Sequence, residues 1–216
     1  HLASLIGRHE VVKALLKDRR TDVTARVSPS SPKKYGSDSD SIIVSAVGSL
    51  LSTFESALPP HTALGLAAKR GHSEVVSILL EDQRIDPNAK GGGSTPLIEA
   101  ASNGHLVTVY ALLADPRVDV NARSTMGISP LMAAARMGYP EIVKTLLSHG
   151  ADANHRALWF GNASALTWTA ERFTDSDEDA RWPEDQEEAE ARREGCLEAI
   201  QVLLSHPGIN RTGYRL

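Results

Sequence analysis

The chain has 216 residues with a formal net charge of -4, and 41% of them are hydrophobic. An acidic balance excludes the global positive field with which proteins attract nucleic acid. No apolar run reaches the roughly 20 residues that a helix needs to cross a bilayer. We therefore expect neither nucleic acid nor a membrane as partner. The single cysteine, Cys196, cannot form an internal disulfide, and we expect a small buried side chain there.

The amino end carries half of a pattern that returns later in the chain. Residues 7–16 place Val, Ala and Leu at helical spacing directly after a glycine, as expected for a helix with one apolar face. They match the second half of each later unit. We therefore expect the sequence to begin inside a repeat and to be a piece of a longer protein.

Residues 27–60 interrupt this pattern. Residues 28–40 are rich in Ser, Pro, Gly and Asp and are typical of an exposed loop. Residues 41–58 then predict an amphipathic helix that ends at two prolines. Three interpretations are open: the helix packs on the rest of the domain, it forms a partner or dimer surface, or it is a degenerate repeat. The apolar stripe consists of Ile43, Val47, Leu50, Leu51, Phe54 and Leu58.

Four segments between residues 62 and 170 are nearly alike. Each opens with Ser or Thr, whose hydroxyl can accept from the free amides of a first helical turn, followed by Pro or Ala. A leucine follows, and these leucines are 33, 34 and 35 residues apart. A second helix with one apolar face is expected over 74–80, 106–113, 141–147 and 197–204. The leucines are Leu64, Leu97, Leu131 and Leu166, and the glycines between the helices include Gly71, Gly104 and Gly138.

An Asp-x-Asn tail closes three of the units, at residues 86–88, 119–121 and 152–154. Such residues favour tight turns, so we expect a projecting hairpin at each junction. Repeated in phase, these features resemble the ankyrin repeat, whose pattern is close to T-P-L-H-x-A, G-H and D-V-N-A. A fixed period of this size is typical of stacked helical repeats. The long loop over 79–88 suggests a fungal type.

A second insertion, residues 174–194, splits the last repeat and is rich in Asp and Glu. Pro183 before two acidic residues favours a helix start, so we expect the final second helix to run back into an acidic extension. The segment is either a solvated charged loop or a docking strip for a basic partner. Residues 175–186 do not form a calcium loop, because Ala180 and Gln186 replace the required Gly and Glu.

The sequence thus predicts an all-α ankyrin-repeat solenoid of about five helix-turn-helix units in one domain, residues 1–216. The repeats are expected over approximately 1–26, 61–90, 91–123, 124–156 and 157–210. The two inserted segments are residues 27–60 and 174–194.

No catalytic or metal-binding motif stands out. The chain has no H-E-x-x-H, paired-cysteine zinc spacing, phosphate loop or nucleophile elbow. We expect His72, His105 and His149 to bond turn backbone, and we predict no enzyme, no metal and no cofactor. One alternative is an enzyme or small-molecule binder in which the insertions roof a pocket lined by Glu99, Asn103, Arg136 and Trp168. Another is an oligomerisation or autoinhibitory segment of a larger signalling protein.

The ankyrin resemblance implies that a partner protein or peptide binds the concave face and the hairpin fingers. Trp159 and Phe160 are the first candidates, because aromatic residues near Arg are favoured at interface hot spots; alternatively both rings cover the last repeat. Basic residues on one face predict an acidic or amphipathic peptide, and we expect an intracellular location, cytoplasmic or nuclear. The predicted binding residues are Lys69, Arg70, Asn103, Arg123, Met126, Arg136, Met137, Arg156, Trp159 and Phe160.

Overall fold

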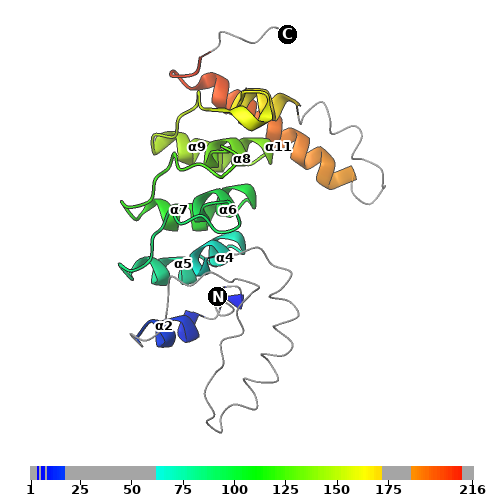
Figure 1. The fold of residues 1–216 in the computed structure, drawn as a ribbon. Coiled ribbons are helices and arrows are strands. Elements are labelled where there is room, and N and C mark those ends of the chain that lie inside the picture. The colour runs from blue at the N-terminus through cyan, green and yellow to red at the C-terminus, as the bar shows by residue number, and fades with distance from the viewer. Residues whose placement is uncertain (1–3, 5, 8, 18–61, 172–185, 211–216) are drawn as a thin grey trace.

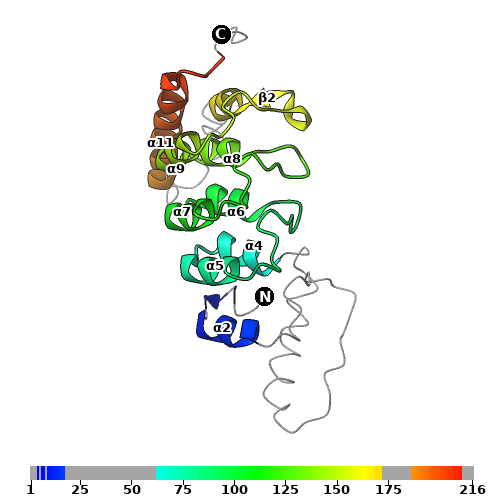
Figure 2. The same ribbon diagram turned by 90° about the vertical axis from the view of Figure 1, so that its left-hand side faces the viewer.

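A computed structural model of the chain describes residues 4, 6, 7, 9–17, 62–171 and 186–210. Helix pairs stack side by side into an elongated solenoid (Figure 1). One column holds the second helices and the other the first helices (Figure 2). The second helices are α2 (His9–Lys17), α5 (Ser73–Leu80), α7 (Leu106–Leu113), α9 (Pro140–Ser148) and α11 (Gln186–Ser205). The first helices are α4 (Ala63–Lys69), α6 (Pro96–Ser102), α8 (Pro130–Arg136) and the helical residues 165–171.

Each first helix begins at the hydroxyl residue that the sequence indicated. Thr62 Oγ1 accepts a hydrogen bond from the Gly65 amide at 3.0 Å, which satisfies one of the free amides of the first turn. A cap of this kind contributes about 1 kcal/mol. The next three first helices begin in the same way. The hydroxyls of Thr95, Ser129 and Ser164 each accept a hydrogen bond from the backbone amide three residues later.

The core is a continuous ridge between the two columns of helices. The leucines that define the period lie in it, with Leu64, Leu97 and Leu131 each 1% exposed and Leu166 6% exposed. The apolar faces of the second helices cover this ridge, for example through Val109 of α7. The all-α solenoid predicted from the sequence is therefore confirmed.

Successive repeats meet at the glycine between their two helices. A Cβ on Gly71 would lie 2.7 Å from the His105 ring of the next repeat, and a Cβ on Gly7 would lie 2.8 Å from the His72 ring. The two junctions are thus equivalent, and α2 packs directly on α5. Among the described elements, α2 and α5 are therefore direct neighbours in the stack. The insertion 27–60, with its predicted helix, lies outside the described residues.

The Asp-x-Asn tails make tight turns and also join neighbouring repeats. The Asn88 amide donates to Asp86 Oδ1 at 2.9 Å, which closes the turn. Asn88 Nδ2 donates to Arg117 O at 2.7 Å, and Asn88 Oδ1 accepts from the Asp119 amide at 2.8 Å. Because each asparagine bonds both an amide and a carbonyl of the following repeat, the spacing between repeats is fixed. The same pair of bonds recurs at Asn121 and Asn154.

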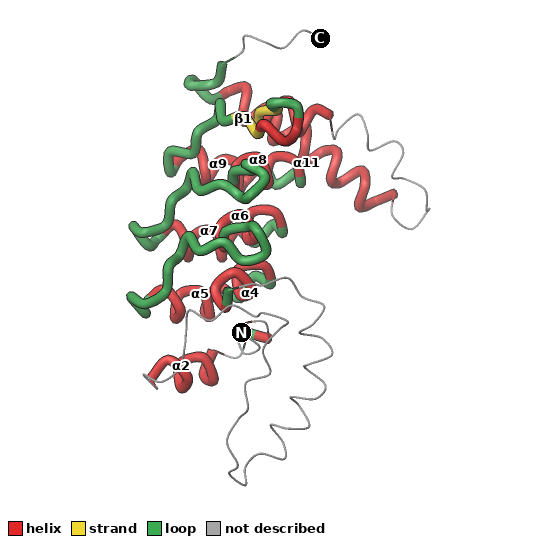
Figure 3. Tube along the Cα trace, in the orientation of Figure 1, coloured by secondary structure: helices red, strands yellow, loops and turns green. Residues whose placement is uncertain are grey.

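The last second helix is more than twice as long as the others. α11 spans 20 residues, and its amino-terminal part runs out beyond the stack while the rest packs on α9 (Figures 1 and 3). The helix therefore extends back into the second insertion, as the sequence predicted. The start at Pro183 and the acidic residues 175–185 lie outside the described residues. In the part of the chain that is described, no helix has the length and apolar character to span a membrane.

Candidate partner-binding surface

Three loops between successive repeats project on the side of the first helices (Figure 2). We name them finger 1 (residues 88–94), finger 2 (residues 121–128) and finger 3 (residues 154–164). Finger 1 is closed by a bridge between Gly91 and Ser94. The Thr125 amide of finger 2 donates to Gly93 O of finger 1 at 2.8 Å, and His155 Nε2 of finger 3 donates to Gly127 O at 2.7 Å. The fingers therefore support one another in series.

Finger 3 is the most regular of them. Strands β1 (Arg156–Ala157) and β2 (Ala163–Ser164) pair antiparallel, with Ala157 opposite Ala163. The turn contains the 3-10 helix η1 (Leu158–Phe160), followed by Gly161 and Asn162 with φ of 61° and 62°. Asn and Gly are the residues that adopt this left-handed conformation at least cost. The turn thus has a defined backbone conformation.

The two aromatic residues of finger 3 have different environments. Because a 3-10 helix has three residues per turn, adjacent side chains point about 120° apart. The Phe160 ring lies 4.7 Å from the Trp168 ring, centroid to centroid, and Trp168 is only 7% exposed. Trp159 remains 78% exposed. The structure therefore separates the pair: Phe160 covers the last repeat, and Trp159 is available to a partner.

Leu158 and Met126 are two further exposed apolar side chains on the fingers. Leu158 is 80% exposed beside Trp159, and Met126 of finger 2 is 54% exposed. Leu158 lies on the same finger but is not among the residues that the sequence predicted to bind, although its position next to Trp159 was the available signal. Leu158 and Trp159 are the most exposed of the large apolar residues among the described positions.

Cations accompany this apolar surface. Lys69 and Arg70 end the helix α4, Arg123 lies on finger 2, and Arg156 lies on finger 3. All four are exposed, and none takes part in an ion pair within the described ranges. These four cations, which the sequence predicted to share one face, are the positive strip considered below, on a chain whose net charge is -4.

Three other predicted residues are engaged within the domain. The Arg136 guanidinium lies 4.2 Å from the centroid of the Trp168 ring, a favourable cation–π contact. Asn103 is exposed, and its Nδ2 donates to Glu99 O at 2.8 Å. Met137 is half-buried. Arg136 and Met137 are thus less exposed than Trp159, and Asn103 is exposed with its amide bonded to backbone.

A family model described as ankyrin repeats (3 copies) matches residues 43–124 and again residues 64–157, which together make up more than half of the sequence. The chain belongs to the ankyrin-repeat family. Among curated proteins, none matches the sequence significantly. Ankyrin repeats generally mediate protein–protein interactions, and the family is typically non-enzymatic.

Two histidines of these ankyrin repeats form hydrogen bonds with backbone carbonyl oxygens near the turns. His105 Nε2 donates to Lys69 O of the preceding repeat at 3.0 Å. His149 Nδ1 lies 2.8 Å from Thr145 O at the end of its own helix. Both therefore bond backbone, as predicted. Among the described residues, no three His, Cys, Asp or Glu side chains gather as a metal site would require. Cys196 is 3% exposed, and its Sγ lies 3.6 Å from Arg136 O.

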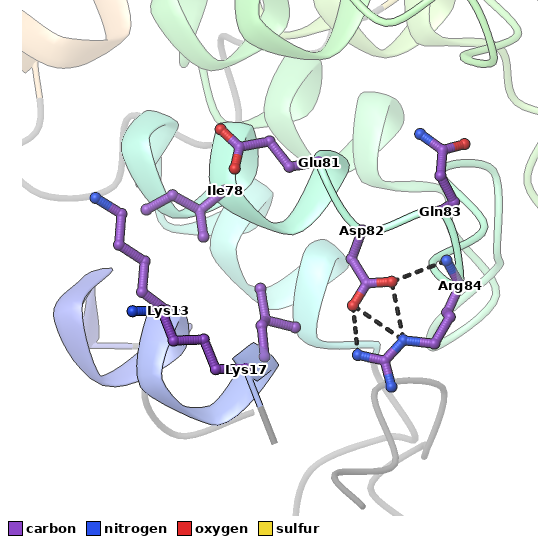
Figure 4. A pocket seen from close by; sticks show the side chains of 8 residues that line it. Lys13, Lys17, Ile78, Glu81, Asp82, Gln83 and Arg84 are labelled. Carbon is purple, nitrogen blue, oxygen red and sulfur yellow. Dashed lines mark hydrogen bonds and ion pairs between the residues drawn. The ribbon is translucent and has the colours of Figure 1, made fainter. Parts of the chain in front are cut away.

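A pocket lies away from the fingers, between α2 and the loop after α5 (Figure 4). It contains the pair formed by Arg84 and Asp82, whose side chains hydrogen-bond at 2.9 and 3.1 Å from Arg84 Nε. The Arg84 guanidinium lowers the pKa of Asp82 through these bonds. The pocket is lined by Lys13, Leu16, Lys17, Ile78, Glu81, Asp82, Gln83 and Arg84.

Comparison with the next ankyrin repeat indicates why a pocket lies at this place. Arg117 occupies the position of Arg84 one repeat later, and its NH2 group donates to Leu80 O of the preceding repeat at 2.6 Å. Arg84 makes no such bond to α2 in the described part of the chain, and the pocket occupies the corresponding place. Its lining differs from the residues that the enzyme alternative requires.

Proposed function

We propose that this ankyrin-repeat domain binds a partner protein or peptide along its fingers, with Leu158 and Trp159 as the anchor. The supporting observation is that these two side chains are about four-fifths exposed on a turn whose backbone is fixed by β pairing and by the contact of Phe160 with Trp168. A preformed scaffold avoids much of the entropy cost that a flexible binding loop incurs. Large aromatic residues in such positions typically contribute about 2 kcal/mol or more to binding.

The charge of the strip selects the kind of partner. Lys69, Arg70, Arg123 and Arg156 attract carboxylates, and exposed cations act mainly on association rate and salt dependence. The partner that fits is an acidic or amphipathic peptide whose apolar side chains contact Trp159, Leu158 and Met126. The proposal contains no catalytic step, and it places the domain inside the cell, in the cytoplasm or the nucleus, with neither nucleic acid nor a membrane as partner.

An affinity capture from the native source tests this function. The wild-type domain is compared with the double variant Leu158→Ala, Trp159→Ala and with Gln201→Ala, an exposed control on α11. Proteins that the wild type and the control retain and the double variant loses are the expected result. A second comparison tests the charge: Arg70→Glu and Arg123→Glu are each compared with the wild type at low salt, and each is expected to retain less of the partner. Identical capture by all of these variants would overturn the proposal.

A further inference from the structure

The solvent-facing side of α7 departs from the other second helices at two positions. The third residue after the inter-helix glycine is glutamate in four repeats but Val107 in α7, and the sixth residue is polar in four repeats but Tyr110 in α7. Val107 is 68% exposed and Tyr110 is 52% exposed. The glutamates are Glu10, Glu74, Glu141 and Glu198, and the polar residues are Lys13, Ser77, Lys144 and Gln201.

The stack does not account for these two apolar side chains. The opposite face of α7 already supplies the core, with Val109 and Leu112 each 0% exposed. A helix that is apolar on all sides is normally buried on all sides. The outer face of α7 is therefore a surface that α5 and α9 leave uncovered in the middle of the row of second helices (Figure 2).

The tyrosine is held in a fixed position on this surface. Its hydroxyl lies within hydrogen-bond distance, 3.2 Å, of Thr145 Oγ1 on α9. Thr145 is itself anchored, because its hydroxyl donates to Glu141 O at 2.8 Å. The ring of Tyr110 thus spans from α7 toward α9 and loses little conformational freedom when a partner covers it.

Carboxylates flank the apolar centre. Glu74 on α5 and Glu141 on α9 are both exposed, and α7 packs against both of these helices. Glu141 accepts a hydrogen bond from Lys144 at 2.5 Å, and Glu198 of the next repeat also acts on Lys144 electrostatically. At this position of the repeat the outer face therefore presents a carboxylate, an apolar residue and a carboxylate in series; Glu74 lies 3.4 Å from His9 Nδ1, as Glu141 lies beside Lys144.

We propose that the outer face of α5, α7 and α9 is a second docking surface, which binds a basic amphipathic helix of a partner protein. An apolar side chain of that helix contacts Val107 and Tyr110, and a Lys or Arg on each side pairs with Glu74 and Glu141. This surface lies on the column of second helices, and its occupation is independent of the fingers.

The repeat spacing favours a helix over an extended peptide. Packed helices are about 8–10 Å apart, so the three contact points are separated by that distance. Residues seven apart in an α-helix lie on one face and are about 10.5 Å apart. Residues on one face of an extended strand are about 6.6 or 13 Å apart, and neither distance matches. The expected motif has an apolar residue with basic residues seven positions before and after it.

A direct binding assay tests this proposal. The probe is a labelled helical peptide of about 20 residues, with Leu at its centre, Arg seven residues to each side, and Ala and Gln elsewhere; the control peptide has Glu in place of Arg. Fluorescence anisotropy measures the affinity of each peptide for the wild type and for the variant Val107→Glu, Tyr110→Lys. Since four other repeats carry Glu at the first position and two carry Lys at the second, the variant is expected to fold, which thermal melting checks.

The expected result is binding of the Arg peptide that falls about tenfold or more in the double variant. Glu74→Gln, Glu141→Gln weakens binding and its salt dependence, and Leu158→Ala, Trp159→Ala leaves it unchanged. Equal affinity for the Arg and Glu peptides, no wild-type binding, or full binding by the double variant would overturn the proposal. Sedimentation showing a wild-type dimer that the double variant loses would also overturn it, because the patch would then join two copies of the chain.

Discussion

Gly195 of α11 lies directly against the backbone of Gly138, the residue between α8 and α9. A Cβ on Gly195 would overlap the Gly138 carbonyl oxygen and lie 3.0 Å from the carbonyl carbon. In the three earlier junctions, a ring from His72, His105 or Tyr139 covers the equivalent glycine. In the last junction α11 continues through this point, so its backbone replaces the ring and both residues must lack a side chain.

Replacement of Gly195 by alanine should therefore destabilise the domain, although alanine normally stabilises a helix by about 1 kcal/mol relative to glycine. We expect Gly195→Ala to lower the free energy of unfolding by about 2 kcal/mol or more, because the backbone of Gly138 cannot move without shifting a helix. Urea denaturation measures the change.

Gly150→Ala provides the matched control. Gly150 has φ of 84°, and a Cβ there would meet nothing within 4 Å. Its replacement costs only the backbone conformation, about 1 kcal/mol. A Gly195→Ala variant as stable as the wild type, or more stable, would show that the two backbones are not in close contact.

The neighbouring aromatic residues of finger 3 should respond differently to truncation. Phe160→Ala removes the contact with Trp168 and should reduce the free energy of unfolding by about 2 kcal/mol, less than for a fully buried phenylalanine because Phe160 is only half-buried. Trp159→Ala should change stability by less than about 0.5 kcal/mol, as is usual at exposed positions. Urea unfolding of both variants is the measurement. Equal losses would mean that Trp159 also packs on the last repeat.

Much of the fold could be predicted from the sequence, because the helices of each repeat are set by the spacing of a few residues within that repeat. The Ser or Thr before Leu64 and its equivalents, and the glycine after them, fix where each first helix begins and ends. Buried positions recur with the same period, so the sequence alone could place Leu97 and Leu131 in the core. The segment 27–60 lacks this clear spacing, so the sequence left three interpretations of it open, and the ankyrin family match that begins at residue 43 includes part of it.

The candidate binding surface could be predicted less completely from the sequence, because it depends on the direction in which each side chain points. Position in the repeat placed Trp159 and Phe160 on one finger, but only the 3-10 turn assigns the first to solvent and the second to Trp168. Arg136 was likewise expected on the groove, and it stacks on Trp168. That ring comes from the following repeat; the enzyme alternative had placed Arg136 and Trp168 in one pocket, but the spacing of the repeats does not show that the guanidinium packs on the ring.

Arg117 joins its repeat to the preceding one by hydrogen bonds, so its replacement tests how much this contact contributes to the stability of the stack. Arg117 donates to Asp115, to Leu80 O at 2.6 Å and to Ile85 O at 3.2 Å, whereas within the described ranges Arg84 bonds only its own Asp82. Arg117→Met should lower the free energy of unfolding, because two carbonyls of the preceding repeat lose a charged donor. Arg84→Met should lower it by less, because an exposed ion pair contributes little to stability; urea denaturation of the two variants measures both changes.

The same joint predicts a pH dependence. The hydrogen bonds from Arg117 lower the pKa of Asp115 below its ordinary value of 3.8. A depressed carboxyl pKa stabilises the fold above the unfolded value, and this contribution is lost as pH falls through the folded pKa. The deficit of Arg117→Met relative to wild type should therefore be constant above about pH 5 and should shrink below about pH 4. A deficit that grows at acid pH would contradict this.

Thr108 of α7 predicts a stabilising change. Its side chain is 1% exposed, and its hydroxyl has no hydrogen-bond partner in the described part of the chain. Leaving such a group unpaired costs about 1–3 kcal/mol, and the equivalent position in other repeats holds Val75 or Ile142. Thr108→Val should thus raise the free energy of unfolding by about 1 kcal/mol, measured in urea.

Thr169→Val is the control for this substitution. Thr169 is 0% exposed, but its hydroxyl donates to Ala165 O at 2.6 Å, so its replacement gives up a hydrogen bond and should lower stability by about 1 kcal/mol. Because the two changes are chemically identical, the opposite signs isolate the hydroxyl partner as the cause. If Thr108→Val also lowered stability, the Thr108 hydroxyl would have to be hydrogen-bonded in solution, for example to a buried water.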